Sequence, residues 1–165
     1  PSIVYGIFGM ILFVEMLFKG FSLLAGIFTM AIMILPLVMR TTEEALRAVP
    51  DSFREGSFAL GAGKLRTIFR VVLPSAMPGI IAGVILALGR VVGETAALIY
   101  TSGTVKAVPD SLFGSGETLA IHMYTLSSEG LHVNEAWATA IVLILLVLVI
   151  NGAAEFISNK FRKRY

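Results

Sequence analysis

The chain contains no cysteine, and only 15% of its 165 residues are charged. The lack of cysteine excludes disulfides, thiolate metal sites and cysteine nucleophiles. His122 and His132 have no third ligand clustered with them, which argues against a structural zinc site. The run Gly61-Ala62-Gly63-Lys64 lacks the full G-x-x-x-x-G-K-[ST] pattern and a βαβ context, so the chain should not bind ATP by itself. We expect no cofactor and no enzymatic site.

Apolar residues make up 56% of the chain, and the mean hydropathy is +0.86. An ordinary soluble domain has about 25% charged residues, so this composition is typical of an integral membrane protein. The net charge of +2 and the pI near 9.2 do not indicate nucleic acid, because the basic residues stand beside apolar spans. We interpret these residues as determinants of orientation in the membrane.

Four apolar segments approach the length of about 20 residues that a membrane-spanning helix needs. The shortest of them, 3–18, includes Glu15 and would form a hairpin with the next segment. The sequence therefore predicts an all-α polytopic transmembrane helical bundle with spans at about 3–18, 21–39, 75–101 and 136–157.

Lysine and arginine are distributed unequally among the connections. Six crowd the stretch 40–70 and four follow Asn159, whereas 101–133 contains only Lys106. By the positive-inside rule the first two regions are cytoplasmic and the third is external. We therefore predict a multi-pass protein of the cell (inner) membrane with a cytoplasmic C-terminus, in contact with membrane lipid.

The chain begins without methionine, without a basic n-region and without a cleavable signal pattern. We interpret residues 1–165 as the C-terminal part of a longer transmembrane domain. The external region 101–134 is rich in glycine and is expected to be a loop around a short helix near 118–126.

The cytoplasmic stretch after Thr41 alternates apolar and charged residues at helical spacing. Pro50 interrupts it, so the sequence predicts two short helices, about 42–49 and 52–60. Gly61 and Gly63 then permit a sharp turn. The second helix would present an apolar surface to a partner, made of Phe53, Phe58 and Leu60.

The residues Glu55-Gly56-Ser57, Gly61, Val71 and Leu73-Pro74 resemble the "EAA" signature of ABC importer permeases. That pattern is Glu-Ala-Ala, x3, Gly, x9, Ile, x, Leu-Pro, and the spacing matches at every fixed position. Gly56, Ser57 and Val71 depart from its letters. The resemblance implies a coupling helix, about 42–61, that docks on a cytoplasmic ABC ATPase dimer. Leu73-Pro74 would connect this element to the next span.

Arg90 and Glu94 are the only charges between Val71 and Val105. On one helix, residues four apart are neighbours, and an arginine at the centre of a span costs about 2.5–3.5 kcal/mol on insertion scales. One interpretation is a neutralising pair that locks the helix against its neighbours. In the other, Arg90 offers a charged fork to an oxyanion, while Glu94 orients it and limits how tightly the anion is held.

The run ALGRVVGETAALIYTSG resembles the Arg-x-x-Gly-Glu-Thr motif of phosphate-specific ABC permeases. PSIVYGIFG, RTTEEALRAVP and AWATAIVLILLVLVIN also fit that family, and the likeness is greater to the PstA type than to the PstC type. It implies that Arg90 and Glu94 serve phosphate passage, with Thr95 and Thr101 as possible hydroxyl donors. It also implies a second permease subunit and an external phosphate-binding protein.

Two alternatives stay open. The cargo could be another oxyanion, such as sulfate, molybdate or phosphonate, because a single Arg–Glu pair does not encode tetrahedral chemistry. A proton-coupled secondary carrier could instead use Glu15, Arg90 and Glu94 as a relay, and it would need no coupling insert.

Overall fold

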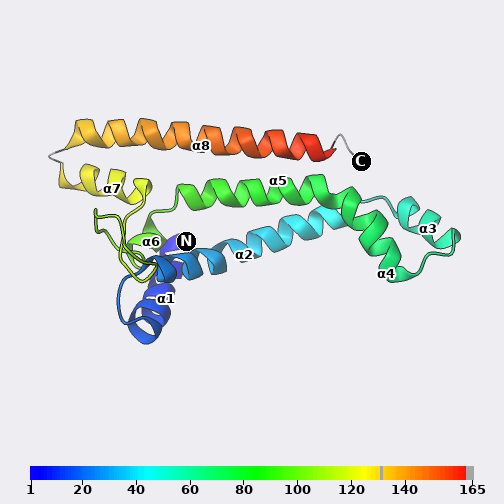
Figure 1. Ribbon diagram of the computed structural model, residues 1–165, viewed down its shortest axis with the longest axis horizontal. Coiled ribbons are helices and arrows are strands. Elements are labelled where there is room, and N and C mark those ends of the chain that lie inside the picture. Colours follow the sequence, from blue (N-terminus) through cyan, green and yellow to red (C-terminus); the bar gives the residue numbers. More distant parts are fainter. Residues whose placement is uncertain (131, 163–165) are drawn as a thin grey trace. The chain divides into compact units, whose positions relative to one another are not determined.

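The computed structural model describes residues 1–130 and 132–162, which form helices joined by turns and loops without any strand (Figure 1). This confirms the all-α class. The chain divides into two compact units. Unit 1 comprises Pro1–Leu35 and Gly89–Val149, and unit 2 comprises Pro36–Leu88 together with the chain from Ile150 on.

Three helical segments of the described chain are long and apolar enough to cross a membrane: Leu23–Arg47, Lys64–Val92 and Val133–Phe156. The first is helix α2, and the last lies within α8 (Val133–Arg162). The predicted spans 21–39 and 136–157 fall largely on these helices. The predicted span 3–18 coincides with a shorter apolar helix, formed by α1 (Ser2–Gly9) and the π-helix η1 (Met10–Leu17).

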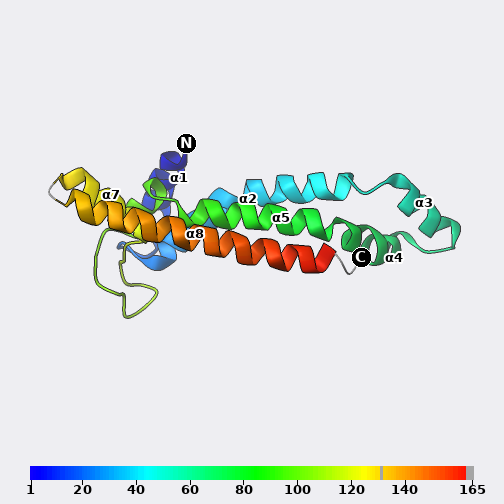
Figure 2. The ribbon, with the colours of Figure 1, turned by 90° about the horizontal axis from the view of Figure 1, so that it is seen from above.

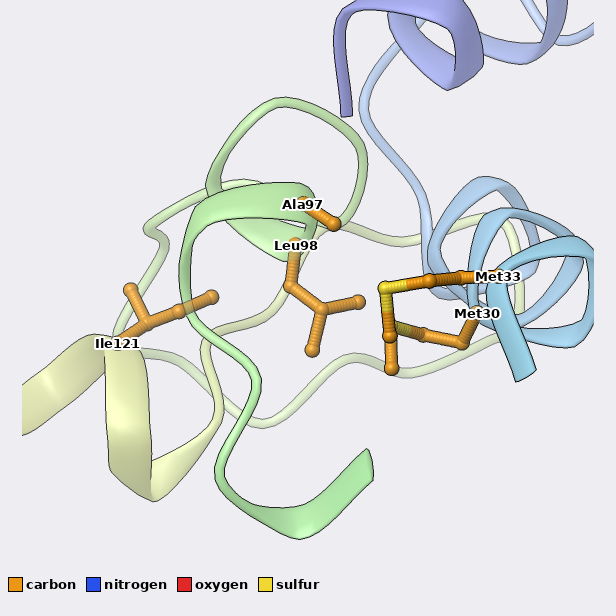
Figure 3. Close-up of a cluster of buried hydrophobic side chains, with 5 residues drawn as sticks. All are labelled: Met30, Met33, Ala97, Leu98 and Ile121. Atoms are coloured by element: carbon orange, nitrogen blue, oxygen red, sulfur yellow. The ribbon is translucent and has the colours of Figure 1, made fainter. Parts of the chain in front are cut away.

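Unit 1 is built around the short helix α6 (Ala96–Ile99), which lies against α1. The contact requires glycine at position 6, because a Cβ there would lie 2.9 Å from the Cα of Ala97. Figure 3 shows Leu98 of α6 between the methionines of α2 and Ile121 of α7 (Leu119–Glu129). This buried cluster contains Met30, Met33, Ala97, Leu98 and Ile121.

The loop 101–117, which Figure 2 shows as an extended excursion, is bonded to the start of α2. The amides of Ser22, Leu23 and Leu24 donate to carbonyls of this loop over 3.0–3.1 Å. These bonds satisfy amides at a helix N-terminus that otherwise have no intrahelical partner. The short helix expected near 118–126 is present as α7, with Thr118 as its N-cap.

Unit 2 contains α3 (Asp51–Ala59), α4 (Lys64–Thr67), the π-helix η2 (Ile68–Val72) and the start of α5 (Leu73–Val92). Figures 1 and 2 show α3 and α4 as a hairpin-like excursion between α2 and α5. The prediction of a separate helix at 42–49 is wrong, because α2 continues without a break to Arg47. Pro50, three residues after Arg47, has no amide with which to extend the helix. The expected helix 52–60 is present as α3.

Within unit 2, α2 and α5 approach closely at two glycines. A Cβ on Gly79 would lie 2.7 Å from the Cβ of Ala45, and one on Gly83 would lie 2.6 Å from the Cβ of Thr41. A small apolar cluster of Val49, Val72 and Ala76 is buried on the side of these contacts that leads to α3. The helices on either side of α3 are therefore held together at the base of the excursion.

Candidate functional site

The single helix expected over 75–101 is not present. Helix α5 ends at Val92, and α6 begins at Ala96 after a non-helical break at Gly93-Glu94-Thr95. Glycine is a poor helix former, by about 1 kcal/mol relative to alanine, so the sequence itself weakens the helix at Gly93. Arg90 therefore lies in the last turn of α5, and Glu94 lies in the break.

Glu94 is buried, with 9% of its surface exposed, and its Oε1 accepts a hydrogen bond from the Ala97 amide over 3.2 Å. The carboxylate thus satisfies an amide in the first turn of α6, where no intrahelical acceptor exists. This corrects the expected geometry of an Arg90–Glu94 pair on one helix face. Glu94 holds the break in shape rather than orienting Arg90.

Arg90 is exposed, and it takes part in no ion pair or side-chain hydrogen bond among the residues that the structure describes. A guanidinium carries five N–H donors in a planar fork, and here they are not consumed by the protein. A positive charge in the last turn also interacts favourably with the helix dipole. The helix dipole therefore stabilises the Arg90 guanidinium without using any of its N–H donors.

The two threonines beside the break differ. Thr95 is half-buried, and its hydroxyl lies 3.5 Å from the Gly93 carbonyl, at the limit of a hydrogen bond. Thr101 is fully buried and donates to the Ala97 carbonyl over 2.9 Å. Thr101 therefore has no free proton to offer a ligand, whereas Thr95 keeps most of its donor capacity.

Sequence reasoning missed a buried carboxylate in the loop that precedes α7. The side chain of Glu117 is 8% exposed, and its Oε1 lies 2.6 Å from Nδ1 of His122. Its Oε2 is buried and has no hydrogen-bond partner within residues 1–130 and 132–162. Glu117 and His122 stand five residues apart across the N-terminus of α7, and this spacing alone does not predict that their side chains meet. No group of three metal-ligating side chains occurs in the described chain.

The second set of predicted residues lies on the coupling segment, defined here as residues 51–74. Helix α3 has no buried residue, and Glu55 and Gly56 are exposed. Its apolar side chains are also uncovered, with Phe53 49%, Phe58 48% and Leu60 90% exposed. The three apolar side chains of the predicted surface are thus exposed, two of them on α3 and Leu60 at its C-cap.

Gly61 ends α3 in the left-handed conformation, with φ of 79°. The Gly61 amide donates to the Phe58 carbonyl over 2.9 Å, and the Ala62 amide donates to the Ser57 carbonyl over 3.1 Å. This pair of bonds is a Schellman motif, which satisfies carbonyls at a helix C-terminus. The predicted turn at Gly61 is confirmed.

Leu73 and Pro74 are half-buried and begin α5 directly after η2. Proline supplies no amide to the preceding turn of a helix, and here that turn has the wider π geometry. Leu73 is the C-cap of η2, and its amide donates to the Ile68 carbonyl. The helical path from Lys64 to Val92 is nevertheless uninterrupted, so the coupling segment continues directly into a candidate span.

The family model described as "Binding-protein-dependent transport system inner membrane component" matches residues 1–163. The chain belongs to this family. It is therefore a component of a membrane transport system, and the helices long enough to span a membrane agree with that place. No solved structure matched the chain.

Curated relatives agree with the family. The chain is 37% identical to the probable ABC transporter permease protein YqgI of Bacillus subtilis, covering 99% of this chain and 61% of that protein. It is 39% identical to the phosphate transport system permease protein PstA 1 of Mycobacterium tuberculosis, over 95% of this chain and 53% of the relative. For PstA of Yersinia pestis the values are 37%, 97% and 55%. The chain thus spans between half and two thirds of the length of these relatives.

Proposed function

We propose that this chain is part of the permease subunit of an ATP-driven ABC importer that moves inorganic phosphate into the cytoplasm. The observation that carries the proposal is Arg90, an arginine at the end of a long apolar helix whose donors are unused in the described chain. Charged residues inside membrane spans usually face a bundle interior or a water-filled path. The names of the relatives in Mycobacterium tuberculosis and Yersinia pestis supply the cargo.

In the proposed mechanism, the guanidinium of Arg90 binds phosphate oxygens through two parallel N–H donors. Arginine stays charged at every physiological pH, so anion binding at this site does not require a prior protonation step. The break at Gly93-Glu94-Thr95 brings the hydroxyl of Thr95 and the negative charge of Glu94 into the same segment. The carboxylate opposes an anion held by Arg90, which keeps binding weak enough for release.

The exposed apolar side of α3 is the proposed docking surface for a cytoplasmic ABC ATPase dimer. Glu55, Gly56 and Ser57, together with Gly61 and Leu73-Pro74, are the residues we assign to this coupling. ATP binding would close the dimer and shift the permease between inward-open and outward-open states. A second permease subunit would complete the path, and an external binding protein would deliver phosphate. The C-terminus would be cytoplasmic.

The test is uptake of labelled phosphate by the complete complex in membrane vesicles. We expect uptake to require ATP and to persist when the proton gradient is collapsed. Excess unlabelled phosphate should compete strongly, and sulfate or molybdate should compete weakly. Uptake that survives ATP depletion with the gradient intact would support a proton-coupled carrier instead. Stronger competition by another oxyanion would keep the importer but change its cargo.

A further inference from the structure

The C-terminus of α2 has a carbonyl that the backbone cannot satisfy. In an α-helix the Leu46 carbonyl would accept from the amide of residue 50, and residue 50 is proline, which has no N–H. The Val49 carbonyl is in a similar position, because the Phe53 amide bonds to the Pro50 carbonyl instead, over 3.1 Å. Two acceptors are therefore left at the junction between α2 and α3.

One side chain of α3, that of Arg54, donates hydrogen bonds to both carbonyls. Nη2 of Arg54 donates to the Leu46 carbonyl over 2.9 Å, and Nη1 donates to the Val49 carbonyl over 3.0 Å. Nη1 also lies 2.6 Å from Oδ1 of Asp51. The Arg54 side chain is 30% exposed, so it lies along the junction rather than in solvent. Bonds from a charged donor are about twice as strong as neutral ones.

A second polar contact fastens α3 three residues further along the helix. The hydroxyls of Ser57 and Thr67 lie 2.9 Å apart, and Thr67, in α4, is 1% exposed. Helix α3 therefore has one attachment toward α2, through Arg54, and one toward α4, through Ser57. Since α3 buries none of its own residues, these polar contacts rather than a core set its orientation.

We infer that Arg54 is a positioning residue that makes α3 and the end of α2 move as one body. A push on α3 is then delivered to α2 as well as through Leu73-Pro74 to α5. This inference rests on the proposed function, because it assumes that a partner pushes on α3. The fork geometry of arginine matters, since two carbonyls are bridged at once and a lysine ammonium is a compact point charge.

The functional test compares Arg54→Ala with Arg47→Ala in the complete complex. Arg47 is a matched control, because its side chain is 79% exposed and its contact is an ion pair with Glu43 on the same helix. We expect Arg54→Ala to lower the phosphate taken up per ATP hydrolysed by about fivefold or more, the low end of typical coupling effects. Arg47→Ala should keep the wild-type ratio, and Arg54→Lys should give an intermediate ratio.

The ratio separates positioning from folding. A variant that only folds poorly yields less complex, which lowers uptake and hydrolysis together and leaves their ratio unchanged. A wild-type ratio in Arg54→Ala and Arg54→Lys would overturn the inference. Absence of ATP-dependent phosphate uptake in the wild-type complex would instead overturn the proposed function.

A second measurement does not depend on the cargo. Because these 165 residues contain no native cysteine, spin labels can be placed at Met39→Cys in α2 and Ser52→Cys in α3, two exposed positions outside the proposed docking surface. We expect a narrow distance distribution between α2 and α3 in the otherwise wild-type complex and a broad one with Arg54→Ala. Equal widths would show that Arg54 does not hold the two helices together, whatever the complex transports.

Discussion

Arg54 and Arg90 carry the same charge and are used in opposite ways. Arg54 bridges two backbone carbonyls and a carboxylate at the junction of α2 and α3. Arg90, at the end of α5, makes no side-chain hydrogen bond within the described part of the chain. An arginine whose donors are consumed locally stabilises a structure, whereas one whose donors are unused can bind a ligand.

The surrounding segments differ in the same way. Three sets of hydrogen bonds shape the coupling segment 51–74: those that Arg54 donates, those of the Schellman motif at Gly61, and the Ser57–Thr67 contact. The break at 93–95 is shaped by Glu94, which accepts from the Ala97 amide of α6 and forms no ion pair with Arg90 in the described chain. Polar groups maintain the geometry in both places.

The largest effect is expected for Arg90→Gln. Truncating a charged hydrogen-bonding partner costs about 2–5 kcal/mol, so phosphate uptake should fall by at least about 30-fold at the conversion of 1.4 kcal/mol per tenfold. Assembly with the ATPase should be normal, because Arg90 bonds to no other residue described. Uptake by the purified complex measures this. Lys106→Gln, which removes an exposed charge from the loop 101–117, is the control.

Normal uptake in Arg90→Gln would return the arginine to a structural role. It would also remove the contrast with Arg54, because neither residue would then bind cargo.

An intermediate effect is expected for Gly61→Ser. A side chain in the left-handed conformation costs about 1–2 kcal/mol, and the surroundings of Gly61 are open, so the backbone alone is responsible. The complex should unfold at a lower temperature, and the amount of phosphate transported per ATP hydrolysed should fall. Gly63→Ser is the matched control, because Gly63 has φ of −72° and is the N-cap of α4, where serine is favoured.

Equal behaviour of the two serine variants would show that the turn at Gly61 does not shape the coupling segment.

The smallest effect is expected at Glu94. Glu94→Ala removes the acceptor for the Ala97 amide and should lower the free energy of unfolding by about 1 kcal/mol, as loss of a helix cap does. Glu94→Gln keeps an oxygen acceptor and should preserve that stability. If the carboxylate weakens anion binding, Glu94→Gln should also lower the phosphate concentration that gives half-maximal uptake. Thermal unfolding and uptake kinetics measure the two effects.

A loss of stability in Glu94→Gln equal to that in Glu94→Ala would show that the charge, rather than the cap, holds the break.

Hydrophobic length predicted the helical class and the approximate positions of the apolar helices. The helical spacing after Thr41, with Pro50 and Gly61 as interruptions, predicted α3 and the turn at Gly61, because glycine and proline act locally. These features depend on residues that are close in the chain. The family match covers the same stretch.

The break at 93–95 could not be predicted from spacing, because a separation of four positions from Arg90 to Glu94 fits a continuous helix equally well. Tertiary packing decides where the helix breaks: the short α6 packs against α1 at Gly6, and its Leu98 is buried in the cluster of unit 1. The contacts of Arg54 and Glu117 were missed for the same reason. Each depends on where the backbone turns, and a sequence pattern does not contain that information.

The most direct test measures phosphate uptake and ATP hydrolysis together for Arg54→Ala and Arg90→Gln in the same reconstituted complex. We predict that Arg54→Ala continues to hydrolyse ATP but moves less phosphate per ATP, whereas Arg90→Gln loses phosphate uptake in a fully assembled complex. Wild-type uptake by Arg90→Gln, or the same uptake-to-hydrolysis ratio in Arg54→Ala as in the wild type, would contradict the roles assigned to these two arginines.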